Sequence, residues 1–108
     1  ILKYKKKITK KYQKEFKFNE NINFVNQPKG CTSNYWLNTI KIKNLSLIQR
    51  DKLLKKLNKS YLECRPAWKL LHKLVMFQTC PKSKLSNSEK MECELITLPS
   101  SPVYGKNS

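Results

Sequence analysis

The chain has 108 residues, a length that allows one domain with a modest hydrophobic core. Basic residues outnumber acidic ones by 23 to 7, which gives a formal net charge of +16. No apolar run approaches the roughly 20 residues of a membrane span, and the basic start is not followed by the apolar stretch of a signal peptide. We therefore expect a soluble, cytoplasmic protein. Because the first residue is Ile1 rather than Met, we also expect a part of a longer protein.

The charge raises nucleic-acid binding as a candidate function, because clustered basic residues neutralise phosphates. Only Arg50 and Arg65 are arginine, and the 21 lysines are spread along the whole chain. Sequence readers use arginine for bidentate base contacts, and single-strand binders interleave basic and aromatic residues. Neither pattern is clear here, and A/T-rich codons account for the excess of Lys, Asn, Ile, Phe and Tyr without a partner. A small basic nucleic-acid-binding module remains the alternative function.

The four cysteines do not predict a metal site. They lie far apart, with no C-x-x-C pair, and together with His72 they do not match the usual spacing of zinc ligands. In the absence of a secretion signal, four separate thiols are favoured over a disulfide framework. The cysteines are Cys31, Cys64, Cys80 and Cys93.

The first 18 residues predict an amphipathic helix whose polar face is almost wholly basic. Its apolar residues recur at near-helical spacing at Leu2, Ile8, Tyr12 and Phe16. A helix on a membrane surface would look similar, but its apolar face would be stronger in Leu, Phe and Trp. We therefore expect this face to pack on the core.

Two strands and a second helix are expected next. Residues 22–25 predict a short strand, and residues 33–43 predict the central strand because they are rich in aromatic and β-branched side chains. Trp36 and Trp68 are expected in the core. Ser46 and Gln49 have the spacing of a capping box, which predicts a helix over 47–59.

The remaining chain predicts a strand, a short helix or turn, and a last helix. Residues 61–64 predict a strand that stops before Pro66, and residues 70–77 predict the short helix or turn. Ser86 and Glu89 repeat the capping-box spacing at the start of a last helix, which is expected to bury Met91, Leu95 and Ile96. The predicted fold class is α/β, or α+β: a small antiparallel or mixed sheet with helices packed on it.

Three segments, taken in order, resemble one enzyme family. GCTSNYWLNTIKI at 30–42, the QRDKLLKKLN helix with CRPAWKLLHKLVMF after it, and CPKSKLSNSEKMECELITLPSSP at 80–102 resemble the C-terminal part of DegT-type nucleotide-sugar aminotransferases, and within these the LegC-like group. The resemblance implies the C-terminal small domain of the fold-type-I pyridoxal-phosphate-dependent transferases over residues 1–102, followed by a tail at 103–108.

The resemblance also implies the chemistry of the intact enzyme. Family members transfer an amino group, usually from glutamate, to the keto carbon of a nucleotide-linked 4-keto-6-deoxy sugar for surface-polysaccharide or glycan precursors, and they are homodimers. The lysine that holds pyridoxal phosphate lies in the family's large N-terminal domain, so no residue of this chain is expected to be catalytic or to bind the cofactor covalently. The chain alone is expected to be inactive: a fragment, a split or decayed gene product, or a non-catalytic remnant that pairs with a separate large-domain chain.

The substrate-binding residues implied by the resemblance are Arg65, His72, Ser33, Asn34 and Tyr35. Arg65 would pair with a phosphate or carboxylate, and His72 would hydrogen-bond the sugar or its pyrophosphate. The alternative for Arg65 is an exposed turn residue whose side chain pairs with Glu63. The alternative for His72 is a partly buried imidazole bonded to backbone.

The chain departs from the family pattern at several positions. Tyr61 stands where the family usually ends the second helix with glycine, and a left-handed cap there would cost a non-glycine residue about 1 kcal/mol or more. Val75 replaces a usual proline, while Ser88 and Cys93 occupy small apolar positions.

Overall fold

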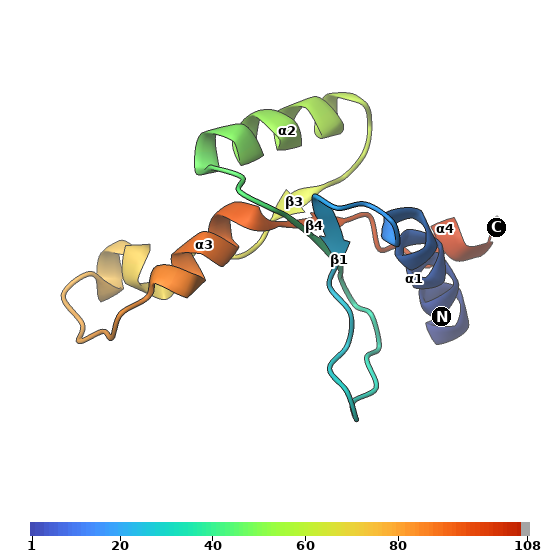
Figure 1. Cartoon of the computed structure of the whole chain (residues 1–108), viewed down its shortest axis with the longest axis horizontal. Helices are drawn as coiled ribbons and strands as arrows, with labels where there is room; N and C mark the ends of the chain where they lie inside the picture. The colour runs from blue at the N-terminus through green and yellow to red at the C-terminus, as the bar shows by residue number, and fades with distance from the viewer. Residues whose placement is uncertain (107–108) are drawn as a thin grey trace.

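The computed structural model describes residues 1–106 (Figure 1). The elements follow in the order α1 (Leu2–Phe16), β1 (Ile22–Phe24), β2 (Asn38–Ile42), α2 (Leu47–Lys59), β3 (Arg65–Pro66), the short 3-10 helices η1 (Leu71–Lys73) and η2 (Val75–Phe77), α3 (Ser86–Glu94), β4 (Leu95–Leu98) and α4 (Val103–Lys106).

The four strands form one antiparallel sheet in the order β1-β2-β4-β3. Ile40 of β2 pairs with Phe24 on one side and with Ile96 on the other, so these three side chains lie on the same face. The predicted fold class, a small sheet with helices packed on it, is confirmed, and the sheet is antiparallel. Residues 38–42, which lie within the central strand predicted over 33–43, form one of its two central strands.

The core lies between one face of this sheet and the helices α1 and α2. Phe24, Ile40, Leu54, Cys64 and Ile96 form its buried cluster. Partly buried side chains from the two helices complete it, including Tyr12 and Phe16 of α1 and Leu53 and Leu57 of α2. The sheet and its helices therefore make two layers, as Figure 1 shows with α2 on one side and α1 at the edge.

The two helices with clear 3.6-residue periodicity form as predicted. Helix α1 buries Ile8 and Thr9. Helix α2 begins at a complete capping box, because the Ser46 side chain accepts from the Gln49 backbone N–H while the Gln49 side chain accepts from the Ser46 N–H. The local sequence alone therefore specifies where α2 begins.

Helix α2 ends in a Schellman motif that has tyrosine at the left-handed position. The Leu62 N–H donates to the Leu57 carbonyl at 3.1 Å, and the Tyr61 N–H donates to the Asn58 carbonyl at 3.1 Å. Tyr61 has φ of 59° and a side chain that is 94% exposed. The departure from glycine at this position therefore places a bulky residue in the conformation that glycine adopts without strain.

Several predicted elements are wrong in position or type. Residues 61–64 form no strand; the pairing occurs at β3, Arg65–Pro66, where a proline is tolerated because the strand is at the sheet edge. The predicted strand over 33–43 forms only from Asn38. The last helix ends at Glu94, because Leu95 and Ile96 are in β4. The second capping box is absent, since α3 has no side-chain cap.

The expected places of the two tryptophans also differ from the structure. Trp36 is 64% exposed and Trp68 is 78% exposed, so neither is in the core. Residues 103–106 of the expected tail form α4, which packs against α1, while residues 107–108 lie outside the described residues. Within residues 1–106, no helix is long and apolar enough to cross a bilayer.

The chain is more extended than a compact domain of its length. Its radius of gyration is 15.5 Å, against about 13 Å expected for a compact chain of this size. Figure 1 shows the reason: the loop between β1 and β2 projects from one end of the sheet, and an arm formed by η1, η2 and α3 projects in another direction. These two projections carry most of the predicted site residues.

Candidate substrate-binding site

A buried polar junction joins the SNYWLN and LPSSP segments. Asn38 is fully buried, and both its backbone N–H and its side-chain amide donate to the Ser100 hydroxyl, at 2.8 and 3.1 Å. The Ser100 hydroxyl in turn donates to the Leu98 carbonyl at 2.8 Å. Segments that lie some 60 residues apart in the sequence therefore meet at one hydroxyl.

Two side chains of helix α1, Thr9 and Lys5, form hydrogen bonds to this junction. The Thr9 hydroxyl bonds the Asn38 side-chain oxygen at 2.7 Å. The Lys5 ammonium donates to the carbonyls of Trp36 and Ser100 at 3.1 and 2.9 Å, and to that of Tyr35 at 3.4 Å. One lysine therefore holds both segments, and a charged donor makes these hydrogen bonds stronger than neutral ones.

Tyr12 adds a further link between α1 and the second segment. Its hydroxyl donates to the Pro99 carbonyl at 2.9 Å. Burial raises the pKa of this phenol, and the thiol of Cys64 and the phenol of Tyr104 raise it further. Tyr12 therefore stays a neutral hydrogen-bond donor at physiological pH.

Ser33, Asn34 and Tyr35 lie in the loop between β1 and β2. The Ser33 hydroxyl accepts from the Tyr35 N–H at 3.0 Å, and the Asn34 side-chain oxygen accepts from the Trp36 N–H at 3.0 Å. Tyr35 has φ of 48°, a left-handed conformation that costs a non-glycine residue on the order of 1–3 kcal/mol. Lys5, through the carbonyl of Tyr35, helps to hold this strained turn.

The phenol of Tyr35 is also engaged within the loop. It lies 3.3 Å from the Gln27 side-chain oxygen, which in turn accepts from the Ser33 N–H at 2.9 Å. Ser33 and Tyr35 therefore shape the loop, while Asn34 is exposed and has an amide NH2 group that can donate hydrogen bonds.

Arg65 lies on the edge strand β3, opposite Thr97. Its carbonyl accepts from the Thr97 hydroxyl at 3.1 Å, while its side chain is exposed. Within residues 1–106 its guanidinium forms no ion pair, with Glu63 or with any other carboxylate. The Arg65 fork is therefore available for an external anion.

His72 lies on η1 and faces α3. Its Nε2 lies 3.2 Å from the Glu89 carboxylate, and its side chain is only 14% exposed. The imidazole is partly buried, as the alternative interpretation held, but its partner is a carboxylate rather than backbone. Because Nε2 is engaged, Nδ1 is the ring nitrogen that remains for a ligand.

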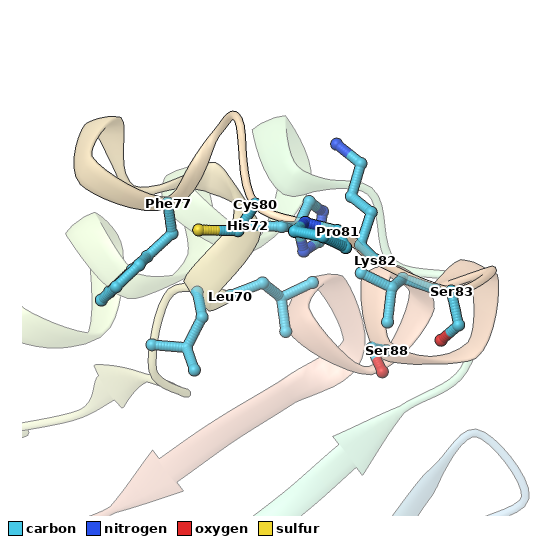
Figure 2. Close-up of a pocket in the computed structure, with 10 residues that line it drawn as sticks. Leu70, His72, Phe77, Cys80, Pro81, Lys82, Ser83 and Ser88 are labelled. Carbon is cyan, nitrogen blue, oxygen red and sulfur yellow. The ribbon is translucent and has the colours of Figure 1, made fainter.

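A pocket of about 530 Å³ opens beside His72, between the 3-10 helices and the start of α3 (Figure 2). This volume lies in the range of small-molecule sites. Leu70 and Phe77 lie on one side of the hollow, Ser83 and Ser88 lie on the other, and Lys82 extends away from them. The pocket therefore offers an apolar wall with hydroxyl groups opposite.

Glu92 anchors the arm that carries this pocket. One of its carboxylate oxygens is paired with the Lys73 ammonium, and the other accepts from the Leu70 N–H at 3.4 Å. Burial alone would raise the pKa of Glu92, but these hydrogen bonds outweigh burial and hold it below its usual value. The same hydrogen bond raises the pKa of Lys73. Within the arm, η1 is thus held to α3 by a pair charged at neutral pH.

The predicted site residues occupy three separate places in the described chain. Ser33, Asn34 and Tyr35 are in the loop, Arg65 is on the sheet edge, and His72 is on the arm, and Figure 1 shows the loop and the arm projecting in different directions. The structure brings Ser33 and Tyr35 together, and it does not bring Arg65 or His72 to them.

Lys5 is the residue that sequence reasoning missed. It is one of many lysines, but at helical spacing it shares the inward face of α1 with Ile8, Thr9 and Tyr12. A lysine on the apolar face of a helix needs acceptors inside the protein. That position was the available signal.

The described residues do not fit pyridoxal phosphate. A covalent site needs a lysine inside a cavity and a carboxylate for the pyridine nitrogen. Only Lys5, Lys41 and Lys73 are less than fully exposed among the lysines, and each is occupied by carbonyls or by a glutamate. The chain's single aspartate, Asp51, pairs with Arg50. Residues 1–106 also hold no group of three or more potential metal ligands.

A comparison with profiles of known protein families gives a match over nearly the whole chain. The profile of the DegT/DnrJ/EryC1/StrS aminotransferase family matches residues 1–107. No curated protein matches the chain in sequence.

Solved structures share its fold at low sequence identity. The Helicobacter pylori PseC aminotransferase, involved in the biosynthesis of pseudoaminic acid, matches with a TM-score of 0.83 and 16% identity over 98% of this chain and 30% of its own. A putative sugar aminotransferase from Streptococcus pneumoniae, in its PMP-form, matches at 0.78 and 21% over 99% of this chain and 28% of its own. The Escherichia coli GDP-4-keto-6-deoxy-D-mannose-3-dehydratase with bound hydrated PLP matches at 0.73 and 17%, over 97% and 28%. The chain therefore spans about 30% of the length of these proteins.

Proposed function

Because the chain belongs to the DegT/DnrJ/EryC1/StrS aminotransferase family, we propose that it is the C-terminal small domain of a pyridoxal-phosphate-dependent enzyme of the LegC-like group. The intact enzyme aminates a nucleotide-linked 4-keto-6-deoxy sugar, with glutamate as the donor, for a surface polysaccharide or glycan. It works in the cytoplasm as a homodimer, and its catalytic lysine lies outside these 108 residues.

The match of the family profile over residues 1–107 carries this proposal. The fold alone would not decide the reaction, since a dehydratase shares it at a TM-score of 0.73. The absence of a fitting lysine within the described residues supports a cofactor site in another part of the enzyme. When bound there, the cofactor supplies the electron sink for the amino transfer.

The residues of this chain act in binding and orientation. The exposed guanidinium of Arg65 suits a pyrophosphate, whose oxygens it can contact with two parallel N–H groups. Nδ1 of His72 and the amide NH2 group of Asn34 are polar groups that can bond sugar hydroxyls. Ser33 and Tyr35 fix the turn that presents Asn34, and Lys5 fixes that turn to α1.

The test is the fate of labelled nitrogen in the complete reading frame that contains these residues. The purified enzyme is given [15N]glutamate and the 4-keto-6-deoxy sugar nucleotides of the common carriers. The proposal expects 15N in the sugar, detected by mass spectrometry. Loss of a sugar hydroxyl without nitrogen gain, the outcome for a dehydratase, would contradict it.

Two variants test the binding roles. Arg65→Met removes a charge-assisted contact, so KM for the sugar nucleotide is expected to rise by about tenfold or more, with a smaller change in kcat. Arg50→Met is the matched control, because Arg50 instead bonds Asp51 and the Glu92 carbonyl. An equal KM change in both variants would show that Arg65 does not bind the sugar nucleotide.

A further inference from the structure

The arm carries the densest group of exposed apolar side chains in the described chain. Five large ones lie between positions 68 and 77, and they are between 39% and 84% exposed: Trp68, Leu71, Val75, Met76 and Phe77. Elsewhere within residues 1–106, such side chains occur singly or as two sequence neighbours. Single exposed apolar residues are common on protein surfaces, whereas a group of this size marks an interaction site.

Two adjoining hollows lie on the arm. One is the pocket of about 530 Å³ beside His72, and the other, of about 320 Å³, lies between Trp68 and residues of α3 and β4. Leu70 and Ser88, both labelled in Figure 2, line both hollows, so the two form one continuous groove, the arm groove. Its apolar lining includes Trp68, Leu70, Leu71, Phe77, Met91 and Leu95.

Side-chain pairs on α3 hold the arm groove in shape. Glu92 pairs with Lys73 and accepts from the Leu70 N–H at 3.4 Å, while Glu89 lies 3.2 Å from Nε2 of His72. The walls formed by η1 and α3 are therefore fixed before anything binds, which lowers the entropy that docking costs. Among the described residues, none of α1 or α2 lines the groove, and Figure 1 shows the arm projecting from the sheet.

The rim of the arm groove is basic. Lys82 lines the groove, and Lys69 and Lys84 each stand between two lining residues in the sequence. All three lysines are exposed, and within residues 1–106 none of them forms an ion pair. A second copy of this chain would bring the same lysines and a further net charge of +16, so like charges oppose self-association at the groove.

The length of the matched solved proteins identifies a different occupant. This chain covers 28% to 30% of their length, so most of an enzyme of this kind lies outside these residues. We propose that the arm groove receives apolar side chains of the large domain of the same enzyme. The inference rests on the function proposed above. It places the pocket beside His72 between two domains, where ligand sites preferentially occur.

The test is photo-crosslinking in the enzyme made from the complete reading frame. Trp68→p-benzoylphenylalanine places a photoreactive aromatic side chain at the groove. Tyr61→p-benzoylphenylalanine is the matched control, because Tyr61 is another exposed aromatic residue and lines neither hollow. After irradiation of the purified enzyme, the linked peptides are mapped by mass spectrometry.

The Trp68 variant is expected to link to a peptide outside these 108 residues. Its yield should be roughly tenfold or more above that of the control, because only atoms in contact react. A yield no higher than that of the control would overturn the proposal. So would links confined to peptides within the 108 residues, which is the outcome for a second copy docked at the groove.

Cysteine labelling decides if the Trp68 variant does not fold. Leu71→Cys and Ile48→Cys replace apolar residues that are 69% and 70% exposed, and Ile48, on α2, lines neither hollow. Maleimide labelling of the complete enzyme is mapped by mass spectrometry, and each rate is divided by the rate in urea. Position 71 is expected to react about tenfold more slowly than position 48, because a covered thiol is inaccessible. Equal relative rates would overturn the proposal.

Neither readout measures the reaction, so the two proposals can fail separately. A covered groove in an enzyme that transfers no 15N to the sugar would contradict the proposed function alone. An uncovered groove in an enzyme that does transfer 15N would contradict the docking of the large domain alone.

Discussion

Replacing Tyr61 by glycine should stabilise the protein. Tyr61 is at the left-handed position of the Schellman motif that ends α2, with φ of 59°. An L-residue in this conformation pays roughly 1–2 kcal/mol that glycine does not pay. The tyrosine side chain is 94% exposed, so its removal sacrifices little buried area.

The expected gain is about 1 kcal/mol, because glycine loses more backbone entropy on folding and offsets part of the relief. For a domain of this size such a gain raises Tm by about 4–8 °C. Thermal and urea unfolding, followed by far-UV circular dichroism, measure it, and an unchanged m-value shows that only stability has changed.

Tyr61→Ala is the matched control. It removes the same aromatic ring but keeps a Cβ, so the left-handed conformation remains costly and Tm should stay near that of the wild type. If Tyr61→Gly is no more stable than Tyr61→Ala, the strain attributed to this position is refuted.

Three further predictions concern other parts of the structure. Lys5→Met should destabilise the chain by about 2 kcal/mol, because it removes charge-assisted hydrogen bonds to three carbonyls. Lys6→Met on the exposed face should stay within about 0.5 kcal/mol in the same urea titration; similar losses would refute the role of Lys5. Burial alone would raise the pKa of Glu94, but a hydrogen bond from the Asn44 N–H and the positive charges of nearby lysines hold this pKa below its usual value. The ionised carboxylate of Glu94 therefore stabilises the folded state at pH values above the usual carboxyl pKa. This stabilisation is lost as the pH falls through the pKa that Glu94 has in the folded state. Glu94→Gln should flatten the acid limb of the stability profile measured by circular dichroism, and an unchanged limb would contradict this. Burial raises the pKa of the Cys64 thiol, so Cys64 should react with iodoacetamide far more slowly than the exposed Cys31 in a mass-spectrometric time course, and equal rates would contradict this.

The sequence predicts best where one pattern excludes the others. Helix α2 has both a 3.6-residue apolar period and a complete capping box, and it begins and ends where predicted. The prediction for the β4 segment is wrong because Leu95 and Ile96 fit either a helix or a strand over so short a run. Only the pairing of Ile96 with Ile40 decides between them, and that contact joins distant parts of the chain.

The same limit applies to the candidate site. The resemblance singles out the Ser33–Tyr35 turn, but no local pattern shows that Lys5 holds it to Ser100, 95 residues away from Lys5. The strand at Arg65–Pro66 was missed for a related reason. A proline argues against a central strand, and only the topology shows that this strand is at the edge.

The position of the cofactor lysine tests the central claim most directly. The complete reading frame is expressed, the holoenzyme is reduced with borohydride, and the lysine that carries the reduced cofactor is mapped by mass spectrometry. The account predicts one labelled lysine, outside the 108 residues described by this sequence. Stoichiometric label on any of the 21 lysines of this chain would contradict it.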